Sequence, residues 1–129
     1  MALKFLIVDD SQTMRRIVAN SLKNLGYEDF VEAGDGKEAL LKLSADESLN
    51  FVITDWNMPV LSGLELIKAI RSDEKMGKIP VLMVTTRGVK DDIIEALKAK
   101  VNNYVVKPFT PAILREKIDA ILASNGGSN

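Results

Sequence analysis

Residues 3–11 read Leu3-Lys4-Phe5-Leu6-Ile7-Val8-Asp9-Asp10-Ser11, and this stretch decides the fold. Its apolar part is nearly continuous and lacks the polar–apolar alternation of a strand with one face in water, so it predicts a strand covered on both faces. Two carboxylates end the run, and Ser11 after them suits the N-cap of a helix. A buried strand that leads through a polar end into a helix is typical of a parallel α/β fold.

The same strand–helix unit recurs along the chain. Apolar residues at helical spacing separate the expected strands, and Ser62 suits the N-cap of the third helix. Thr110 followed by Pro111 suits the start of the fifth helix, where the missing N–H of proline costs nothing. The expected strands are Leu3–Val8, Asp29–Glu32, Phe51–Thr54, Val81–Thr85 and Asn103–Val106. The apolar stripes of the expected helices are Met14, Ile17, Val18, Leu22 and Leu25; Ala39, Leu40 and Leu43; Leu66, Ile67 and Ile70; Ile93, Ile94 and Leu97; and Leu114, Ile118, Ile121 and Leu122.

Five such units predict an α/β fold with a doubly wound parallel five-stranded sheet, right-handed crossovers and helices on both faces. No linker or internal repeat interrupts residues 3–124, so we expect one domain over residues 1–124. The polar, glycine-containing residues 125–129 predict a disordered tail.

Composition excludes several classes of function. Lys and Arg total 17 against 18 Asp and Glu, and this near-neutral balance gives no electrostatic basis for binding nucleic acid or an anionic membrane. No apolar run approaches the roughly 20 residues of a membrane span, and the first residues lack the pattern of a secretory signal, so we expect a cytoplasmic location. The absence of Cys and His excludes thiolate and imidazole catalysis. A bound metal therefore needs oxygen ligands, which favours hard cations such as Mg²⁺.

Polar residues follow four of the expected strands: Asp9-Asp10 the first, Asp55 the third, Thr85-Thr86 the fourth and Lys107 the fifth. An open parallel sheet binds ligands at the carboxyl ends of its strands, so these residues are expected to share one crevice. Three carboxylates in one partly desolvated place repel one another more strongly than one lysine can offset, and a divalent cation can neutralise them. Such a site suits phosphoryl transfer with a carboxylate as the nucleophile. Because the chain has no His, the phosphoryl group must come from another molecule.

Taken one at a time, these residues have other roles that are equally common, for Asp9 and Asp10, or commoner, for Asp55 and Lys107. Asp9 and Asp10 suit the N-terminus of a helix, where its dipole favours negative charge. Asp55 alone reads as a turn residue before Pro59, and Lys107 alone as a lysine in a solvated loop. The functional interpretation is favoured because they all fall at the same end of successive strands.

Several strings resemble the receiver domains of two-component signalling, most closely the chemotaxis response regulators of the CheY type. The resemblance covers residues 3–123. Flavodoxin and CheY are the standard examples of strand order 2-1-3-4-5, so that flavodoxin-like order is implied by the resemblance. The strings are Leu6-Ile7-Val8-Asp9-Asp10-Ser11, Thr13-Met14-Arg15-Arg16-Ile17-Val18, Asp55-Trp56-Asn57-Met58-Pro59, Gly63-Leu64-Glu65-Leu66 and Tyr104-Val105-Val106-Lys107-Pro108-Phe109-Thr110.

The resemblance implies a role for each residue of the expected crevice. The phosphoacceptor would be Asp55, and the Mg²⁺ ligands would be Asp10, Asp55 and the backbone carbonyl of Asn57, with Asp9 acting through water. Lys107 and Thr85 would contact the phosphoryl group, and Tyr104 would turn inward as Thr85 moves. Trp56 would lie beside Asp55 and report Mg²⁺ binding by its fluorescence. The Lys107–Pro108 peptide bond would be cis.

The resemblance also implies partners. The phosphoryl donor would be a sensor histidine kinase, and the phosphorylated face, made of the fourth helix, fifth strand and fifth helix, would bind the flagellar motor switch. A phosphatase is a further expected partner, and the chain would act as a monomer that catalyses only its own phosphorylation and dephosphorylation. The alternative is a stand-alone receiver or a phosphorelay intermediate in a pathway other than chemotaxis.

Three residues depart from the usual pattern of these domains. Arg87 stands at the mouth of the site, where we expect it to tune the lifetime of the phosphate. Lys100 stands where glycine commonly closes the fourth helix, so a left-handed backbone there would be strained by roughly 1 kcal/mol. Ser62 replaces a frequent Asp or Asn and caps a helix comparably well.

Two other classes of protein are disfavoured by single residues. Phosphatases of the haloacid-dehalogenase type need a second Asp two residues after the nucleophile, and that position is Asn57. Flavin carriers of similar fold need a glycine- and hydroxyl-rich phosphate loop after the first strand, where Asp9 and Asp10 would repel the phosphate.

Overall fold

A single parallel sheet forms the centre of the computed structural model, which describes residues 2–86 and 90–127, with the backbone alone for residues 90, 91 and 125–127. The strand order is β2-β1-β3-β4-β5, as the resemblance implies. The strands are β1 (Phe5–Val8), β2 (Phe30–Ala33), β3 (Phe51–Thr54), β4 (Val81–Thr85) and β5 (Asn103–Val106). The helices are α1 (Gln12–Asn24), α2 (Gly36–Ala45), α3 (Gly63–Ser72), α4 (Lys90–Lys98) and α5 (Pro111–Gly127).

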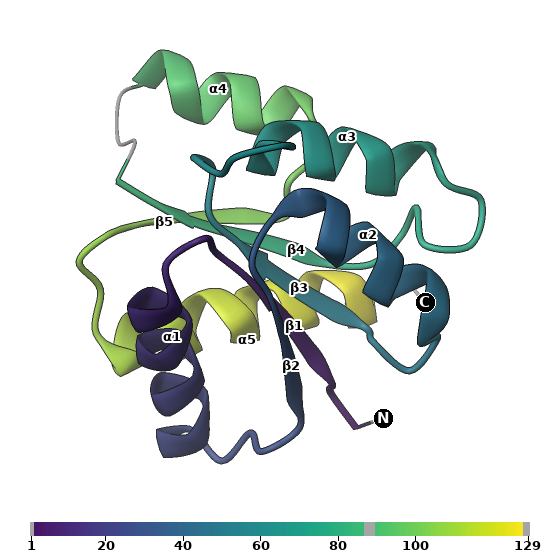
Figure 1. The fold of residues 1–129 in the computed structure, drawn as a ribbon. Coiled ribbons are helices and arrows are strands. Elements are labelled where there is room, and N and C mark those ends of the chain that lie inside the picture. Colours follow the sequence, from purple (N-terminus) through teal and green to yellow (C-terminus); the bar gives the residue numbers. More distant parts are fainter. Residues whose placement is uncertain (1, 87–89, 128–129) are drawn as a thin grey trace.

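Helices cover both faces of the sheet, so the fold has three layers (Figure 1). Helices α1 and α5 lie on one face, and α2, α3 and α4 lie on the other. Alternate residues of β1 point to opposite sides: Phe5 and Ile7 pack with the α1 and α5 residues, whereas Leu6 and Val8 pack with those of α2 and α3. The prediction of a first strand covered on both faces is confirmed.

The register of the strands determines which residues lie next to one another at the carboxyl edge of the sheet. Val8 of β1 is level with Thr54 of β3, so both strands end at the same height. The backbone N–H of Asp55 donates to the carbonyl of Val8 at 3.0 Å, and the N–H of Asp9 donates to the carbonyl of Ala33 at 3.1 Å. The residues that follow β1 and β3 therefore start side by side at one edge of the sheet.

Three helices begin with the capping residues that the sequence predicts. Ser11 accepts a hydrogen bond from the N–H of Met14 at 3.2 Å. Ser62 forms a capping box with Glu65, in which each side chain accepts from the other residue's backbone N–H. The hydrogen bond that the Ser62 backbone N–H donates to the Glu65 carboxylate, followed by the Ser62 side chain, lowers the pKa of this carboxyl. Thr110 accepts from Ile113 at the start of α5, where Pro111 is the first residue. In the described part of the chain, no helix is long and apolar enough to cross a membrane.

Two strand boundaries differ from the prediction. β1 begins at Phe5 rather than Leu3, because the N–H of Lys4 donates to the side chain of Asn50 at 2.8 Å instead of joining the sheet ladder. β2 runs from Phe30 to Ala33, one residue later than expected. At the other end of the chain, the backbone of α5 continues to Gly127, into the stretch predicted to be a tail. Helix ends are less sharply defined than helix centres.

The apolar stripe predicted for α4 is wrong as a core face. Ile94 and Leu97 are 39% and 53% exposed, whereas Ala96 and Ala99 point into the core. Of the predicted stripe, Ile93 is partly buried and Ile94 and Leu97 face outward, while the buried positions of this segment are alanines, which hydrophobic spacing alone does not reveal. The left-handed backbone considered at Lys100 is confirmed, since its φ is +70° two residues after the end of this helix, a conformation that costs a residue with a side chain roughly 1 kcal/mol.

Candidate functional site

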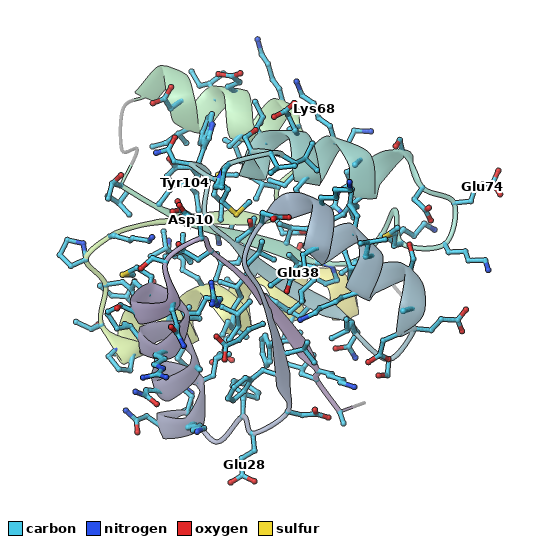
Figure 2. All side chains as sticks on the ribbon, viewed as in Figure 1. Asp10, Glu28, Glu38, Lys68, Glu74 and Tyr104 are labelled. Carbon is cyan, nitrogen blue, oxygen red and sulfur yellow. The ribbon has the colours of Figure 1, made fainter. Side chains whose placement is uncertain are left out.

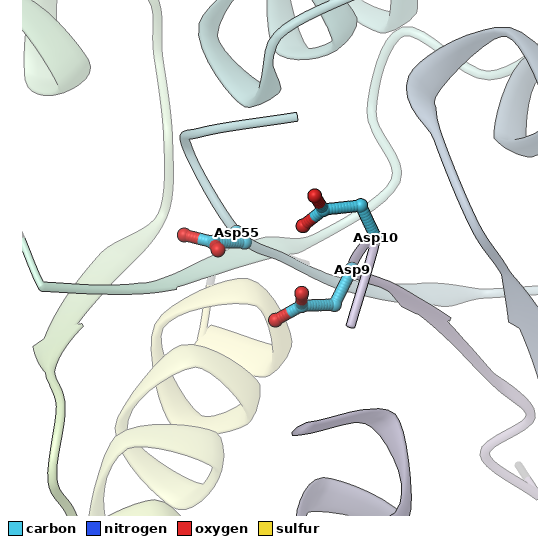
Figure 3. A group of neighbouring side chains, drawn as sticks. All are labelled: Asp9, Asp10 and Asp55. Atoms are coloured by element: carbon cyan, nitrogen blue, oxygen red, sulfur yellow. The ribbon is translucent and has the colours of Figure 1, made fainter. Parts of the chain in front are cut away.

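Three carboxylates meet at the carboxyl ends of β1 and β3 (Figure 3). Asp9 and Asp10 follow β1, Asp55 follows β3, and one oxygen from each lies within 4.8 Å of the other two. Asp9 is buried, Asp55 is partly buried and Asp10 is exposed. The structure thus brings together the three carboxylates that the sequence predicts to meet at the ends of these strands.

Lys107 brings one positive charge to this cluster. Its Nζ lies 3.0 Å from Oδ2 of Asp9 and 3.3 Å from Oδ2 of Asp55. The Lys107–Pro108 peptide bond is cis, as the resemblance implies. The backbone N–H of Lys107 donates to the carbonyl of Thr85 at 2.8 Å, so the lysine starts beside the end of β4. One ammonium against three carboxylates leaves the cluster with negative charge, which fits a divalent cation with oxygen ligands.

The carboxylates differ in what holds them. Asp9 Oδ1 accepts from the backbone N–H of Ser11 at 2.9 Å, and its Oδ2 contacts Lys107. Asp55 Oδ1 accepts from the backbone N–H of Trp56 at 2.6 Å, and its Oδ2 contacts Lys107. No hydrogen bond to the Asp10 carboxylate is found within the described residues. Asp10 is therefore the carboxylate whose oxygens remain available to a ligand.

The loop between β3 and α3 is packed tightly against Asp55. A Cβ placed on Gly63 would lie 2.0 Å from the carbonyl oxygen of Asp55, so only glycine fits without a shift of the backbone. The N–H of Gly63 donates to the carbonyl of Trp56 at 2.8 Å. Helix α3 therefore starts directly against Asp55, the residue that follows β3. In the sequence, Gly63 is marked only as part of a string that resembles receiver domains. The pattern of residues around it does not predict this close packing.

An open cleft leads from the cluster along this loop, with Trp56 as a buried wall. Asp10 lines the same cleft as Asn57, so a cation held at Asp10 would face the loop after β3. The lining residues are Asp10, Trp56, Asn57, Met58, Pro59 and Ser62. The donor set of carboxylates and backbone carbonyls is the kind that Mg²⁺ prefers.

The remaining predicted residues lie around the cluster. Thr85 is the last residue of β4, and its side chain is fully buried. Tyr104 lies in β5 and packs, partly buried, against the core shared with α2 and α3. In the view of Figure 2, Asp10 and Tyr104 are on the left side at mid-height, well away from Glu28 at the bottom, which precedes β2. Arg87 lies outside the described residues.

Comparison with known proteins decides the family. The model described as "Response regulator receiver domain" matches residues 5–119. The chain belongs to this receiver family.

Its relatives include chemotaxis proteins. This receiver domain is 54% identical over 123 residues to Chemotaxis protein CheY1 of Helicobacter pylori, covering 95% of this chain and 99% of that protein. Its structure resembles the chemotaxis response regulator CheY4 of Vibrio cholerae, with a TM-score of 0.86, 34% identity and coverage of 95% and 100% of the two chains. It also resembles the receiver domain of a sensor histidine kinase from Pseudomonas aeruginosa, with a TM-score of 0.81, 26% identity and coverage of 94% and 98%; that structure has a magnesium ion coordinated in its active site cleft.

Proposed function

We propose that this receiver domain accepts a phosphoryl group on Asp55 in a Mg²⁺-dependent reaction and signals in chemotaxis through protein contacts. The observation that carries the proposal is the meeting of Asp9, Asp10 and Asp55 beside Lys107. This set combines a cation site, a carboxylate nucleophile and an ammonium for the transferred oxygens.

Asp55 is the nucleophile of the proposed reaction. The Trp56 N–H at 2.6 Å fixes its Oδ1, and Lys107 at 3.3 Å from Oδ2 orients the other oxygen. A carboxylate oxygen attacks the phosphorus of a phosphohistidine on a sensor kinase: the new P–O bond forms, the P–N bond breaks, and the donor's imidazole takes up a proton. The ammonium of Lys107 neutralises charge on the equatorial oxygens.

The ligands proposed for Mg²⁺ are Asp10, Asp55 and the backbone carbonyl of Asn57, with Asp9 acting through water. The exposed Asp10 carboxylate and the position of Asn57 on the same cleft support this set. When bound, the cation neutralises the phosphoryl oxygens and the carboxylates around them. The magnesium ion in the cleft of the related Pseudomonas aeruginosa receiver supports the same choice of metal.

Thr85 and Tyr104 are proposed to carry the signal away from the site. Thr85 ends β4 and its carbonyl accepts from the backbone N–H of Lys107, which supports a role for it beside the phosphorylation site. Tyr104 is two residues before the end of β5 and only partly buried, which leaves it room to turn inward. Arg87 is proposed to tune the phosphate lifetime; equal dephosphorylation rates for wild type and Arg87→Ala would remove that role.

The output partner is proposed to be the flagellar motor switch, with a phosphatase as a further partner and a monomeric cytoplasmic protein as the signalling form. Apolar side chains left in water support a protein-binding face over α4, β5 and α5. They are Ile94, Leu97, Val106 and Ile113. The names of the CheY relatives support chemotaxis as the pathway.

The chemistry is tested by measuring the intact mass after incubation with a small-molecule phosphodonor and Mg²⁺. Wild type should gain one phosphoryl group, whereas Asp55→Asn and wild type with a chelator should gain none. An equal gain in Asp55→Asn would remove Asp55 as the acceptor. The pathway is tested separately: a deletion strain that swims and changes direction normally would favour a receiver outside chemotaxis.

A further inference from the structure

The side chain of Arg15 lies against the backbone that carries Asp9 and Asp10. Its Nη1 donates to the carbonyl oxygen of Asp9 at 2.6 Å, and its Nε donates to Oε1 of Glu32 at 3.0 Å. The Arg15 side chain is only 17% exposed. An arginine held by two partners in this way has a fixed guanidinium plane. The Thr13–Val18 string that contains Arg15 otherwise has no role in the proposed chemistry.

The backbone hydrogen bonds of the sheet stop just before this point. The Val8 carbonyl accepts from Asp55, and the Asp9 N–H donates to Ala33, so the peptide between Val8 and Asp9 belongs to the sheet. The next peptide lies beyond β1, and its carbonyl, that of Asp9, is the one Arg15 binds. Arg15 therefore donates to the first β1-side carbonyl beyond the hydrogen-bond ladder of the sheet.

Asp10 depends on this peptide more than its neighbours do. The side chains of Asp9 and Asp55 are each held by a backbone N–H and by Lys107. The Asp10 carboxylate has no such contact among the described residues, so the direction of its Cα–Cβ bond is set by the backbone alone. The plane of the Asp9–Asp10 peptide, together with the φ angle of Asp10, sets that direction.

The guanidinium is itself oriented from β2. Glu32 stands level with Ile7 of β1 and binds Nε, which directs the remaining nitrogens toward the end of β1. Lys42 of α2 donates to the Glu32 backbone carbonyl and pairs with Glu38 at 3.2 Å. The chain of contacts thus runs from α2 through β2 to Arg15 and ends at the acid cluster.

We propose that Arg15 is a positioning residue for the metal site: by fixing the Asp9 carbonyl it orients the Asp10 carboxylate for Mg²⁺. The inference rests on the proposed function, since it assigns Asp10 to the cation. Outer-sphere partners of metal ligands typically contribute about 10- to 100-fold to metal affinity. Because Arg15 acts on the backbone of the ligand, we expect an effect of about 10-fold, at the low end of that range.

The proposal is testable because a charge effect and a positioning effect of Arg15 change the Mg²⁺ affinity in opposite directions. If Arg15 acted only as a nearby positive charge, its removal would strengthen the binding of a cation. If it positions Asp10, its removal weakens binding. Arg16, the exposed neighbour on α1, provides a matched control, because Arg16→Gln removes the same charge from the same helix and leaves the contacts of Arg15 in place.

The experiment is a titration with MgCl₂ in which binding is measured by calorimetry and by Trp56 fluorescence. The proteins titrated are wild type, Arg15→Gln, Arg15→Lys and Arg16→Gln. We expect Arg15→Gln to bind Mg²⁺ about 10-fold more weakly. Arg15→Lys keeps the charge but lacks the two-pronged contact, so it should also be weakened. Arg16→Gln should bind as wild type does or slightly more tightly. Urea unfolding of each variant separates these effects from a loss of folded protein.

Two results would overturn the proposal, and they are distinct. Equal affinities for Arg15→Gln and Arg16→Gln, with Mg²⁺ bound by wild type, would remove Arg15 as a positioning residue and leave the proposed function intact. No Mg²⁺ binding by wild type itself would remove the metal site, and the proposed function would fail together with this inference.

Discussion

Gly63→Ala tests how closely the start of α3 packs on the phosphoacceptor. The added Cβ would lie 2.0 Å from the Asp55 carbonyl oxygen and 2.9 Å from Cα of Trp56, whereas ordinary contacts begin at 3.4 Å. Both neighbours are backbone atoms, so the strain cannot be relieved by a side-chain rotation. The first turn of α3 would have to move away from β3.

The magnitude follows from two opposing effects. Overpacking of a tight site costs about 1–3 kcal/mol, and loss of the hydrogen bond from Gly63 to Trp56 adds about 1 kcal/mol. The higher helix propensity of alanine returns at most about 1 kcal/mol. We therefore expect the free energy of unfolding to fall by about 2 kcal/mol, within a range of about 1–4 kcal/mol, a change that a domain of typical stability survives.

Urea denaturation followed by circular dichroism measures this change. With a slope of about 2 kcal/mol per molar urea, the middle of the usual range, the midpoint should fall by about 1 M. Gly34→Ala is the matched control, because a Cβ there would meet its nearest atom at 3.7 Å, an ordinary contact. Equal midpoints for Gly63→Ala and Gly34→Ala would refute the reasoning, and so would a Gly63→Ala protein more stable than wild type.

Backbone strain, a partly exposed ion pair and the metal site each give a further prediction. Val60 and Lys100 both have φ of +70°, so Val60→Asn and Lys100→Gly should each raise the free energy of unfolding by about 1 kcal/mol in urea denaturation; unchanged midpoints would argue against strain. The hydrogen bond from Lys4 lowers the pKa of Asp46 to about 2, so wild type should exceed Asp46→Asn in stability above pH 3.8 and lose that advantage as the pH falls through about 2; a constant difference would contradict this. Mg²⁺ at 100 times its dissociation constant should stabilise wild type by about 2.7 kcal/mol in thermal unfolding, a chelator should abolish the effect, and Asp10→Asn should show little of it.

The sheet and the acid cluster were predictable because they rest on strong local signals. Continuous apolar runs such as Phe51–Thr54 define buried strands, and parallel strands put their carboxyl ends together. Once the five strands are placed, Asp10, Asp55 and Lys107 must meet, whatever the details of the loops. The strand order and the cis bond came from the resemblance, because hydrophobic pattern alone does not order parallel strands.

The features that the sequence did not reveal depend on contacts between distant segments. Arg15 reads as one of two adjacent arginines, and only the register of β1 with β2 places it between Glu32 and the Asp9 carbonyl. Helix α4 packs through Ala96 and leaves Leu97 in water, although the larger residue carries the stronger hydrophobic signal. The strained backbone of Val60 is likewise a product of the loop that leads into α3.

The most direct test of the phosphorylation site is to locate the phosphoryl group in the chain. After incubation with a small-molecule phosphodonor and Mg²⁺, borohydride reduces an aspartyl phosphate to homoserine, and peptide mass analysis identifies the converted residue. We predict conversion at Asp55 in the presence of Mg²⁺ and no conversion with a chelator. Conversion at another carboxylate, or equal conversion at Asp55 without a divalent cation, would contradict the account.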